Sequence, residues 1–105
     1  MNTDTHDSLV DLINDEMLSR GYTNIHRNVS YKQKCAGEID LYVQHNKYIY
    51  LFEMKSSYST KSYNKAIDQL HRAEKYYFRN NGKKRYRVFK FFVYDHKDPK
   101  IKWIQ

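Results

Sequence analysis

Cysteine, proline and glycine are scarce in the 105-residue sequence, which contains one, one and three of them respectively. A single cysteine excludes an intramolecular disulfide and indicates a reducing compartment. With so little proline and glycine, the chain has no linker-like or low-complexity tract. No stretch approaches the roughly 18 apolar residues of a membrane span, and MNTDTHDSLV at the start lacks the pattern of a signal peptide. We therefore expect an intracellular, cytoplasmic protein.

Acidic residues are concentrated near the start of the sequence. The first 19 residues contain five acids and no Lys or Arg, whereas 19 basic and seven acidic residues follow from Arg20 on, a net charge of +12. This asymmetry favours a polyanionic partner, because basic side chains release counterions from phosphates. A basic surface that only maintains solubility is the alternative.

The length fits one compact domain over residues 1–105, and so small a core favours dimerisation. Apolar residues at helical spacing predict helices over about 5–20, ending before Gly21, and over about 62–82. Segments rich in β-branched and aromatic residues predict strands at about 22–31, 38–43, 47–55, 85–95 and 101–105. The fourth of these strands is apolar on both sides, as expected for a strand covered on both faces. The order αβββαβ with a last short strand predicts an α/β fold in which helices flank a mixed sheet.

The central hairpin, GEIDLYVQHNKYIYLFEMKSS, places charged residues in strands that otherwise look buried. A turn centred on residues 45 and 46 puts Glu38 opposite Glu53, and Asp40 opposite Leu51. Side chains two residues apart on a strand share a face. Four ionisable side chains would therefore converge on one face: Glu38, Asp40, Glu53 and Lys55.

Three carboxylates in one such patch repel each other by roughly 3 kcal/mol per pair, at about 5 Å and an effective dielectric of about 20. Lys55 alone cannot neutralise them. A hard divalent cation can, and Mg²⁺ or Mn²⁺ suits carboxylate oxygens together with a main-chain carbonyl. Pairing of these charges on an exposed sheet edge is the alternative.

GEID at 37–40, the Glu53-Met54-Lys55 run after a gap of 12 residues, and KAIDQLHRAEKYY further on resemble the PD-(D/E)XK nuclease superfamily. The likeness covers nearly the whole chain, because αβββαβ is the core of this restriction-endonuclease-like fold. The archaeal and viral Holliday junction resolvases and their small relatives are the most similar members. Ile39 stands where the motif has its proline.

The resemblance implies that Asp40 and Glu53 bind Mg²⁺ or Mn²⁺ through their carboxylates and Met54 through its main-chain carbonyl. Lys55 would orient or deprotonate the attacking water, and Gln69 in the second helix would point toward the site. Such nucleases usually carry a further acid in the first helix, which is not obvious in this sequence. The remaining candidates at the site are His6, Asp7 and Glu38.

Hydrolysis of DNA by a metal-dependent endonuclease, selective for branched junctions, is the function that the resemblance implies. A homodimer is expected because paired cuts need two sites. Two alternatives remain open: a nuclease that degrades single-stranded DNA or RNA in defence or turnover, and a catalytically silent nucleic-acid-binding module. Basic residues expected to grip phosphates without reading bases are Lys32, Lys34, Arg79, Lys83, Lys84 and Arg85.

Overall fold

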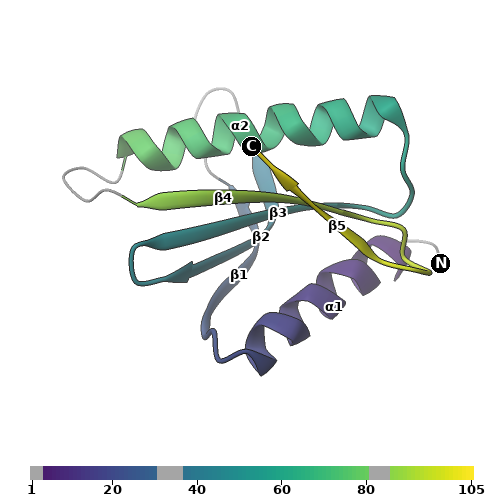
Figure 1. Ribbon diagram of the computed structural model, residues 1–105, viewed down its shortest axis with the longest axis horizontal. Coiled ribbons are helices and arrows are strands. Elements are labelled where there is room, and N and C mark those ends of the chain that lie inside the picture. The colour runs from purple at the N-terminus through teal and green to yellow at the C-terminus, as the bar shows by residue number, and fades with distance from the viewer. Residues whose placement is uncertain (1–3, 31–36, 81–85) are drawn as a thin grey trace.

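A computed structural model describes residues 4–30, 37–80 and 86–105. Their helices and strands are α1 (Asp4–Ser19), β1 (Asn24–Ser30), β2 (Glu38–His45), β3 (Tyr48–Lys55), α2 (Thr60–Asn80), β4 (Arg87–Tyr94) and β5 (Lys100–Ile104). The strands form one sheet in the order β1-β2-β3-β4-β5. Neighbours are antiparallel except for the parallel pair β3 and β4. The predicted α/β fold with a mixed sheet is confirmed, and the two helices lie on opposite faces of the sheet (Figure 1).

The first helix ends at a glycine, as its sequence predicts. Gly21 has a φ of 94°, a conformation that side chains disfavour. The Gly21 N–H donates to the Leu18 carbonyl at 3.0 Å and the Tyr22 N–H donates to the Met17 carbonyl at 3.1 Å. This pair of bonds is a Schellman motif, which closes the last turn. On the buried face of α1 lie Leu9, Val10, Ile13 and Met17.

The second helix covers the other face of the sheet. Its start is capped by Ser59, whose Oγ accepts the Ser62 N–H at 3.1 Å. The predicted apolar face of α2 is confirmed for Ala66, Leu70 and Ala73, which are fully buried. Neither α1 nor α2 combines the length and the apolar character that a membrane-spanning helix requires.

The β2–β3 hairpin turns one residue later than predicted. His45 pairs with Tyr48, so the turn residues are Asn46 and Lys47, and Asn46 has a φ of 55°. Asn tolerates this left-handed conformation better than most residues. Moving the centre of a turn by one residue shifts every cross-strand partner by two. The predicted register was therefore wrong, although an even shift by itself moves no side chain to the other face.

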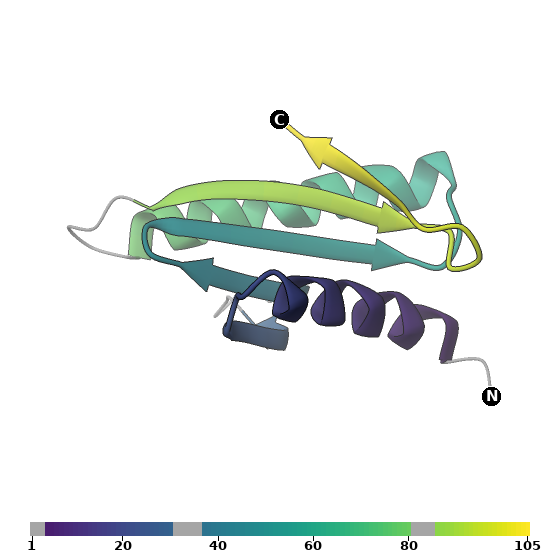
Figure 2. The ribbon, with the colours of Figure 1, turned by 60° about the horizontal axis from the view of Figure 1, so that its bottom comes forward.

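The two helices cover the sheet unevenly. Helix α1 packs mainly against β2 and β3, and Figure 2 shows β4 and β5 without a helix in front of them on the α1 side. Phe92 is fully buried on the α2 side of β4, whereas Phe89 and Phe91 on its α1 side are only partly buried. The prediction that this strand is covered on both faces therefore holds along the α2 side, but on the α1 side only near the end of the strand, where Val93 is fully buried.

Candidate functional site

Asp40 and Glu53 meet at the point where β2 and β3 stop pairing. The backbone pairs of the hairpin end at Leu41 and Phe52. Beyond them, Asp40 Oδ2 accepts the Met54 N–H at 2.8 Å, and Glu53 Oε1 accepts the Asp40 N–H at 3.1 Å. The two carboxylates thus accept hydrogen bonds from backbone N–H groups that lie beyond the last backbone pair of the hairpin.

The alternation of faces along β2 changes at Asp40. Ile39 packs in the hydrophobic cluster on the α2 side, whereas Leu41 packs in the cluster on the α1 side. Opposite this position on β1, Asn28 has a φ of 51° between the residues that pair with Ile39 and Leu41. The Asp40 carboxylate therefore reaches the backbone of β3, where it accepts the Met54 N–H. The predicted convergence of all four charged side chains on one face is wrong: Asp40 contacts Glu53, and Glu53 shares a cavity with Lys55, but the Glu38 side chain is exposed.

Burial changes the protonation of Glu53. Glu53 is only 6% exposed. Its burial raises the pKa of its carboxyl group to about 9; the neighbouring Asp40 carboxylate raises this pKa as well, while Lys55 opposes the shift. A carboxyl group with such a pKa keeps its proton at neutral pH unless a cation replaces that proton.

A cavity of about 390 Å³ lies between β3 and α2, next to Glu53. Its lining residues are Glu53, Lys55, Lys65, Asp68, Gln69 and Arg72. Gln69 Nε2 donates to the Glu38 carbonyl at 2.6 Å, which ties the helix to β2. Arg72 forms an ion pair with Asp68 one turn earlier in α2. The structure thus brings Glu53, Lys55 and Gln69 together as the sequence predicts.

Lys65 and Arg72 were missed by the sequence analysis. They lie four residues before and three residues after Gln69, so all three belong to one stripe of the helix surface. Once Gln69 is placed beside the site, this spacing is the signal that could have identified them.

On the α1 side, His6 approaches the same pair. Its Nε2 lies 3.3 Å from Asp40 Oδ2, and its side chain is 38% exposed. The Asp7 side chain is 69% exposed, and its Oδ1 lies 3.8 Å from His6 Nδ1. Of the two candidates in the first helix, His6 is the one that contacts an acid of the pair.

Glu38 does not join a three-carboxylate cluster. Its side chain is exposed, since the neighbouring Ile39 occupies the α2 side of the sheet and successive side chains point to opposite faces. Over residues 4–30, 37–80 and 86–105, no group of three or more His, Cys, Asp or Glu side chains is placed to hold a metal ion. The predicted basic residues Lys32, Lys34, Lys83, Lys84 and Arg85 lie outside the described residues, as does the side chain of Arg79.

No protein-family model matches the chain, and a search of curated proteins gives no significant match. The chemistry must therefore be inferred from the site itself: two adjoining carboxylates, one of them buried, and a cavity whose walls carry Lys55, Lys65 and Arg72.

Proposed function

We propose that the chain is a metal-dependent endonuclease of restriction-endonuclease-like fold that hydrolyses phosphodiester bonds in DNA. The contact between Asp40 and Glu53, beside a cavity that contains the Lys55 side chain, carries this proposal. Adjoining carboxylates next to an amine match what metal-assisted hydrolysis of a phosphodiester needs: anionic ligands for a cation and a separate group for the proton or the phosphate charge.

The donor set fits Mg²⁺ or Mn²⁺. Carboxylate oxygens of Asp40 and Glu53 and the main-chain carbonyl of Met54 are the hard ligands that these cations prefer. The raised pKa of Glu53 reflects the cost of two adjoining, poorly solvated carboxylates, which a divalent cation would offset. When bound, the cation would supply Lewis-acid polarisation of the phosphate.

The chain's own side chains have separate tasks in this proposal. Lys55 would orient or deprotonate the attacking water from the cavity that it shares with Glu53. Lys65 and Arg72 would bind phosphates on either side of the cleaved bond, since they flank Gln69 along α2. Gln69 would hold α2 against β2 through the Glu38 carbonyl.

Branched DNA is the substrate that we propose, cut by a homodimer in the cytoplasm. The strongly basic chain beyond α1 supports a nucleic-acid partner. Phosphate-binding side chains around the cavity support recognition of the path of the backbone more than of base sequence. DNA is favoured over RNA on the resemblance to junction resolvases.

Single-stranded nucleic acid is a second candidate substrate, and one observation favours it. Tyr58 is 48% exposed and follows Lys55 by three residues. Its ring centroid lies 5.2 Å from that of Tyr94, which is the cross-strand partner of Lys55. An exposed aromatic ring this close to the site could stack on an unpaired base.

Cleavage of four labelled substrates with Mg²⁺ or Mn²⁺ tests the proposal: a four-way junction, a duplex, single-stranded DNA and RNA. We expect symmetric nicking of the junction, lost in Glu53→Ala and in Lys55→Ala. Titration calorimetry should show that Glu53→Ala also loses Mn²⁺ binding while Lys55→Ala keeps it. Lys47→Ala is the matched control, because Lys47 precedes the opposite end of the eight-residue strand β3.

The alternatives give different results in the same experiment. Preferential cleavage of linear single strands would show that single-stranded nucleic acid, and not branched DNA, is the substrate. Salt-sensitive DNA binding without any Mn²⁺ binding would show a catalytically silent module instead of a nuclease.

A further inference from the structure

An apolar strip is exposed on the α1 side of β4 and β5. Trp103 is 57% exposed and Ile101 is 56% exposed, although both point to the same face as their buried or half-buried cross-strand partners, Phe91 and Val93. Phe89, two residues before Phe91, extends the same face. Exposed apolar side chains gathered on one face usually mark an interaction site. We call Phe89, Phe91, Ile101 and Trp103 the β5 strip.

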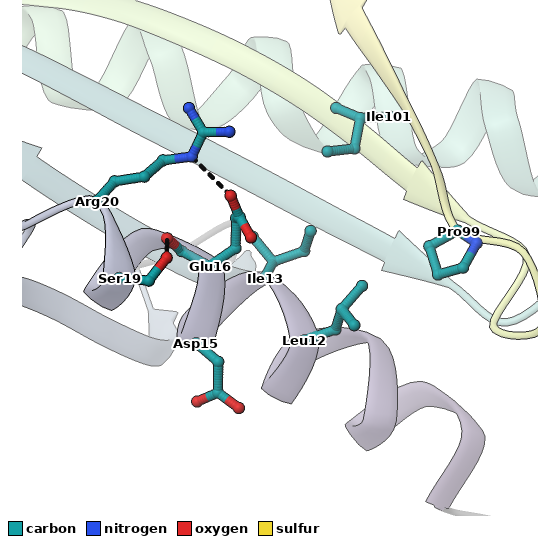
Figure 3. Close-up of a pocket in the computed structure, with 8 residues that line it drawn as sticks. All are labelled: Leu12, Ile13, Asp15, Glu16, Ser19, Arg20, Pro99 and Ile101. Carbon is teal, nitrogen blue, oxygen red and sulfur yellow. Dashed lines mark hydrogen bonds and ion pairs between the residues drawn. The ribbon is translucent and has the colours of Figure 1, made fainter.

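A groove of about 510 Å³ separates the β5 strip from α1. Figure 3 shows Leu12 and Ile13 on the helix side of this groove and Pro99 and Ile101 on the strand side. Leu12 is itself about half exposed. The same face therefore carries a protruding indole and, beside it, an apolar groove large enough to receive one.

Charge is distributed unequally along this face. Asp15 and Glu16 line the groove together with Arg20, whose Nε lies 2.8 Å from Glu16 Oε2, so these side chains leave one net negative charge there. The exposed Arg87 lies four residues before Phe91 on the same side of β4. A groove with one net negative charge does not attract nucleic acid. A partner with a basic group next to an apolar anchor would complement it.

We propose that this face is the interface between two copies of the chain. The β5 strip of each copy would pack across a twofold axis, with Trp103 of one copy entering the groove of the other. A protrusion and its groove on one face make the surface self-complementary, which a closed dimer requires. The twofold axis reverses the direction of the second strip, so that the Arg87 end of one copy points toward the groove end of the other, where Asp15 lies.

The lysines of β5 explain why the contact uses the face and not the strand edge. Lys100 and Lys102 alternate with Ile101 and Trp103 along the strand, so they point to the α2 side. Lys102 Nζ lies 5.1 Å from the centroid of the Tyr63 ring. Antiparallel pairing of two β5 edges would bring these lysines together, and lysines at a sheet edge are a common defence against such pairing.

Two physical considerations favour a dimer. A stable interface buries about 800 Å² per partner around an apolar centre, and the aromatic and aliphatic side chains of the β5 strip and groove supply that centre. A domain of this size gains stability from burying more apolar surface. The interface rests on the homodimer of the proposed function and names its contact surface. It lies on the face of the sheet opposite to the cavity between β3 and α2, so dimerisation can be tested separately from cleavage.

Sedimentation velocity over a range of protein concentrations tests the interface. The wild-type chain should sediment as a dimer, and Trp103→Glu and Ile101→Lys should each raise the dissociation constant roughly 30-fold or more. Tyr58→Glu is the matched control, because Tyr58 is a similarly exposed aromatic residue whose ring contacts Phe92 on the α2 side of the sheet. The control should remain dimeric, and circular dichroism should show all three variants folded.

Tryptophan fluorescence gives a second measurement that needs no variant, because Trp103 is the only tryptophan in the chain. With rising protein concentration, its emission should shift to shorter wavelength and become resistant to acrylamide quenching. A wild-type chain that stays monomeric would overturn the proposal. So would a dimer in which Trp103 remains quenchable, or one that Tyr58→Glu weakens as much as Trp103→Glu does.

Discussion

Asp40 and Glu53 are joined through the backbone as well as through their charges. The Asp40 N–H donates to Glu53 Oε1 at 3.1 Å, while Asp40 Oδ2 accepts the N–H of Met54, the next residue after Glu53. Each carboxylate therefore has one oxygen fixed by the opposite strand, and the distance between the two side chains is set before any ligand arrives. Such preorganisation favours a cation but penalises the charged pair when no cation is bound.

The protonation of Glu53 should make the metal-free protein less stable as the pH rises. The pKa of its carboxyl group is about 9 in the folded state, against 4.5 for an unperturbed glutamate, which represents the unfolded state. Below about pH 4.5 both states are protonated and the stabilisation is fully present. Between pH 4.5 and 9 the folded state holds a proton that the unfolded state has lost, so the free energy of unfolding falls and the contribution is lost near pH 9.

Urea unfolding in EDTA at pH 5 and pH 9 measures this effect. We expect the free energy of unfolding to fall by at least about 1.4 kcal/mol, the equivalent of one pKa unit. Glu53→Gln keeps the shape and cannot titrate, so its stability should change much less over the same range. Saturating Mn²⁺ should also weaken the dependence in the wild-type protein. Equal slopes for wild type and Glu53→Gln would contradict the raised pKa.

His6, and not Asp7, should support the metal site from the first helix. His6 Nε2 lies 3.3 Å from Asp40 Oδ2, whereas the Asp7 carboxylate points largely into solvent. Residues that orient a metal ligand typically contribute 10- to 100-fold to affinity or activity, so His6→Ala should lower Mn²⁺ affinity by roughly that factor. Asp7→Asn should change it less than about threefold. Titration calorimetry of both variants with Mn²⁺ measures the two effects. A larger loss of affinity in Asp7→Asn than in His6→Ala would show that Asp7, not His6, supports the metal site.

Lys65 and Arg72 should bind phosphates of the nucleic acid. Both line the cavity next to Glu53, on the stripe of α2 that includes Gln69. Removal of one phosphate contact lowers the slope of log affinity against log salt by about 1. Lys65→Ala and Arg72→Ala should each show this change for junction DNA, measured by fluorescence anisotropy at several salt concentrations in Ca²⁺ or EDTA.

Lys47→Ala is the control for these two variants. It removes the same charge but precedes the far end of β3, roughly 25 Å from Lys55 at about 3.3 Å per residue. Its salt slope should equal that of the wild-type protein. If all three variants lose the same affinity, DNA is attracted by net charge and the cavity has no special part in binding.

The sequence predicted the charged pair and its neighbours better than it predicted their geometry. Asp40 and Glu53 stand out because carboxylates in otherwise apolar strands need a partner. The register was wrong by two positions because the position of a tight turn depends on which residue adopts a positive φ, here Asn46. The change of face at Asp40 was not predictable from alternation, since it coincides with the unusual backbone of Asn28 on another strand.

The sequence pattern also did not predict the burial of Lys90. The β4 segment looks apolar on both sides, and one lysine within it is easily taken as solvent-exposed. Its partner, Glu74, belongs to α2 and is separated from it by 16 residues. Only the packing of α2 on the sheet brings the two charges together, so no local rule of spacing connects them.

The pair of buried Lys90 and half-buried Glu74 gives a prediction about stability. Lys90 is 7% exposed on its side chain, and its Nζ lies 2.6 Å from Glu74 Oε1 and 3.3 Å from His71 Nδ1. Glu74→Ala would leave a buried ammonium group without its anion, which should lower the free energy of unfolding by about 1–3 kcal/mol. Replacing both residues, in Lys90→Met with Glu74→Leu, removes the charge and its partner together and should be close to neutral.

Asp11→Ala is the matched control for the loss of Glu74. This substitution also breaks an ion pair between a helix and a strand, because Asp11 Oδ1 lies 2.5 Å from a guanidinium nitrogen of Arg27. In this pair, however, both side chains are exposed. Such a pair contributes less than about 1 kcal/mol. Urea unfolding of the four proteins at one concentration measures the difference. Equal losses for Glu74→Ala and Asp11→Ala would mean that water reaches Lys90 once Glu74 is removed, and that burial of the ammonium group adds nothing to the value of the pair.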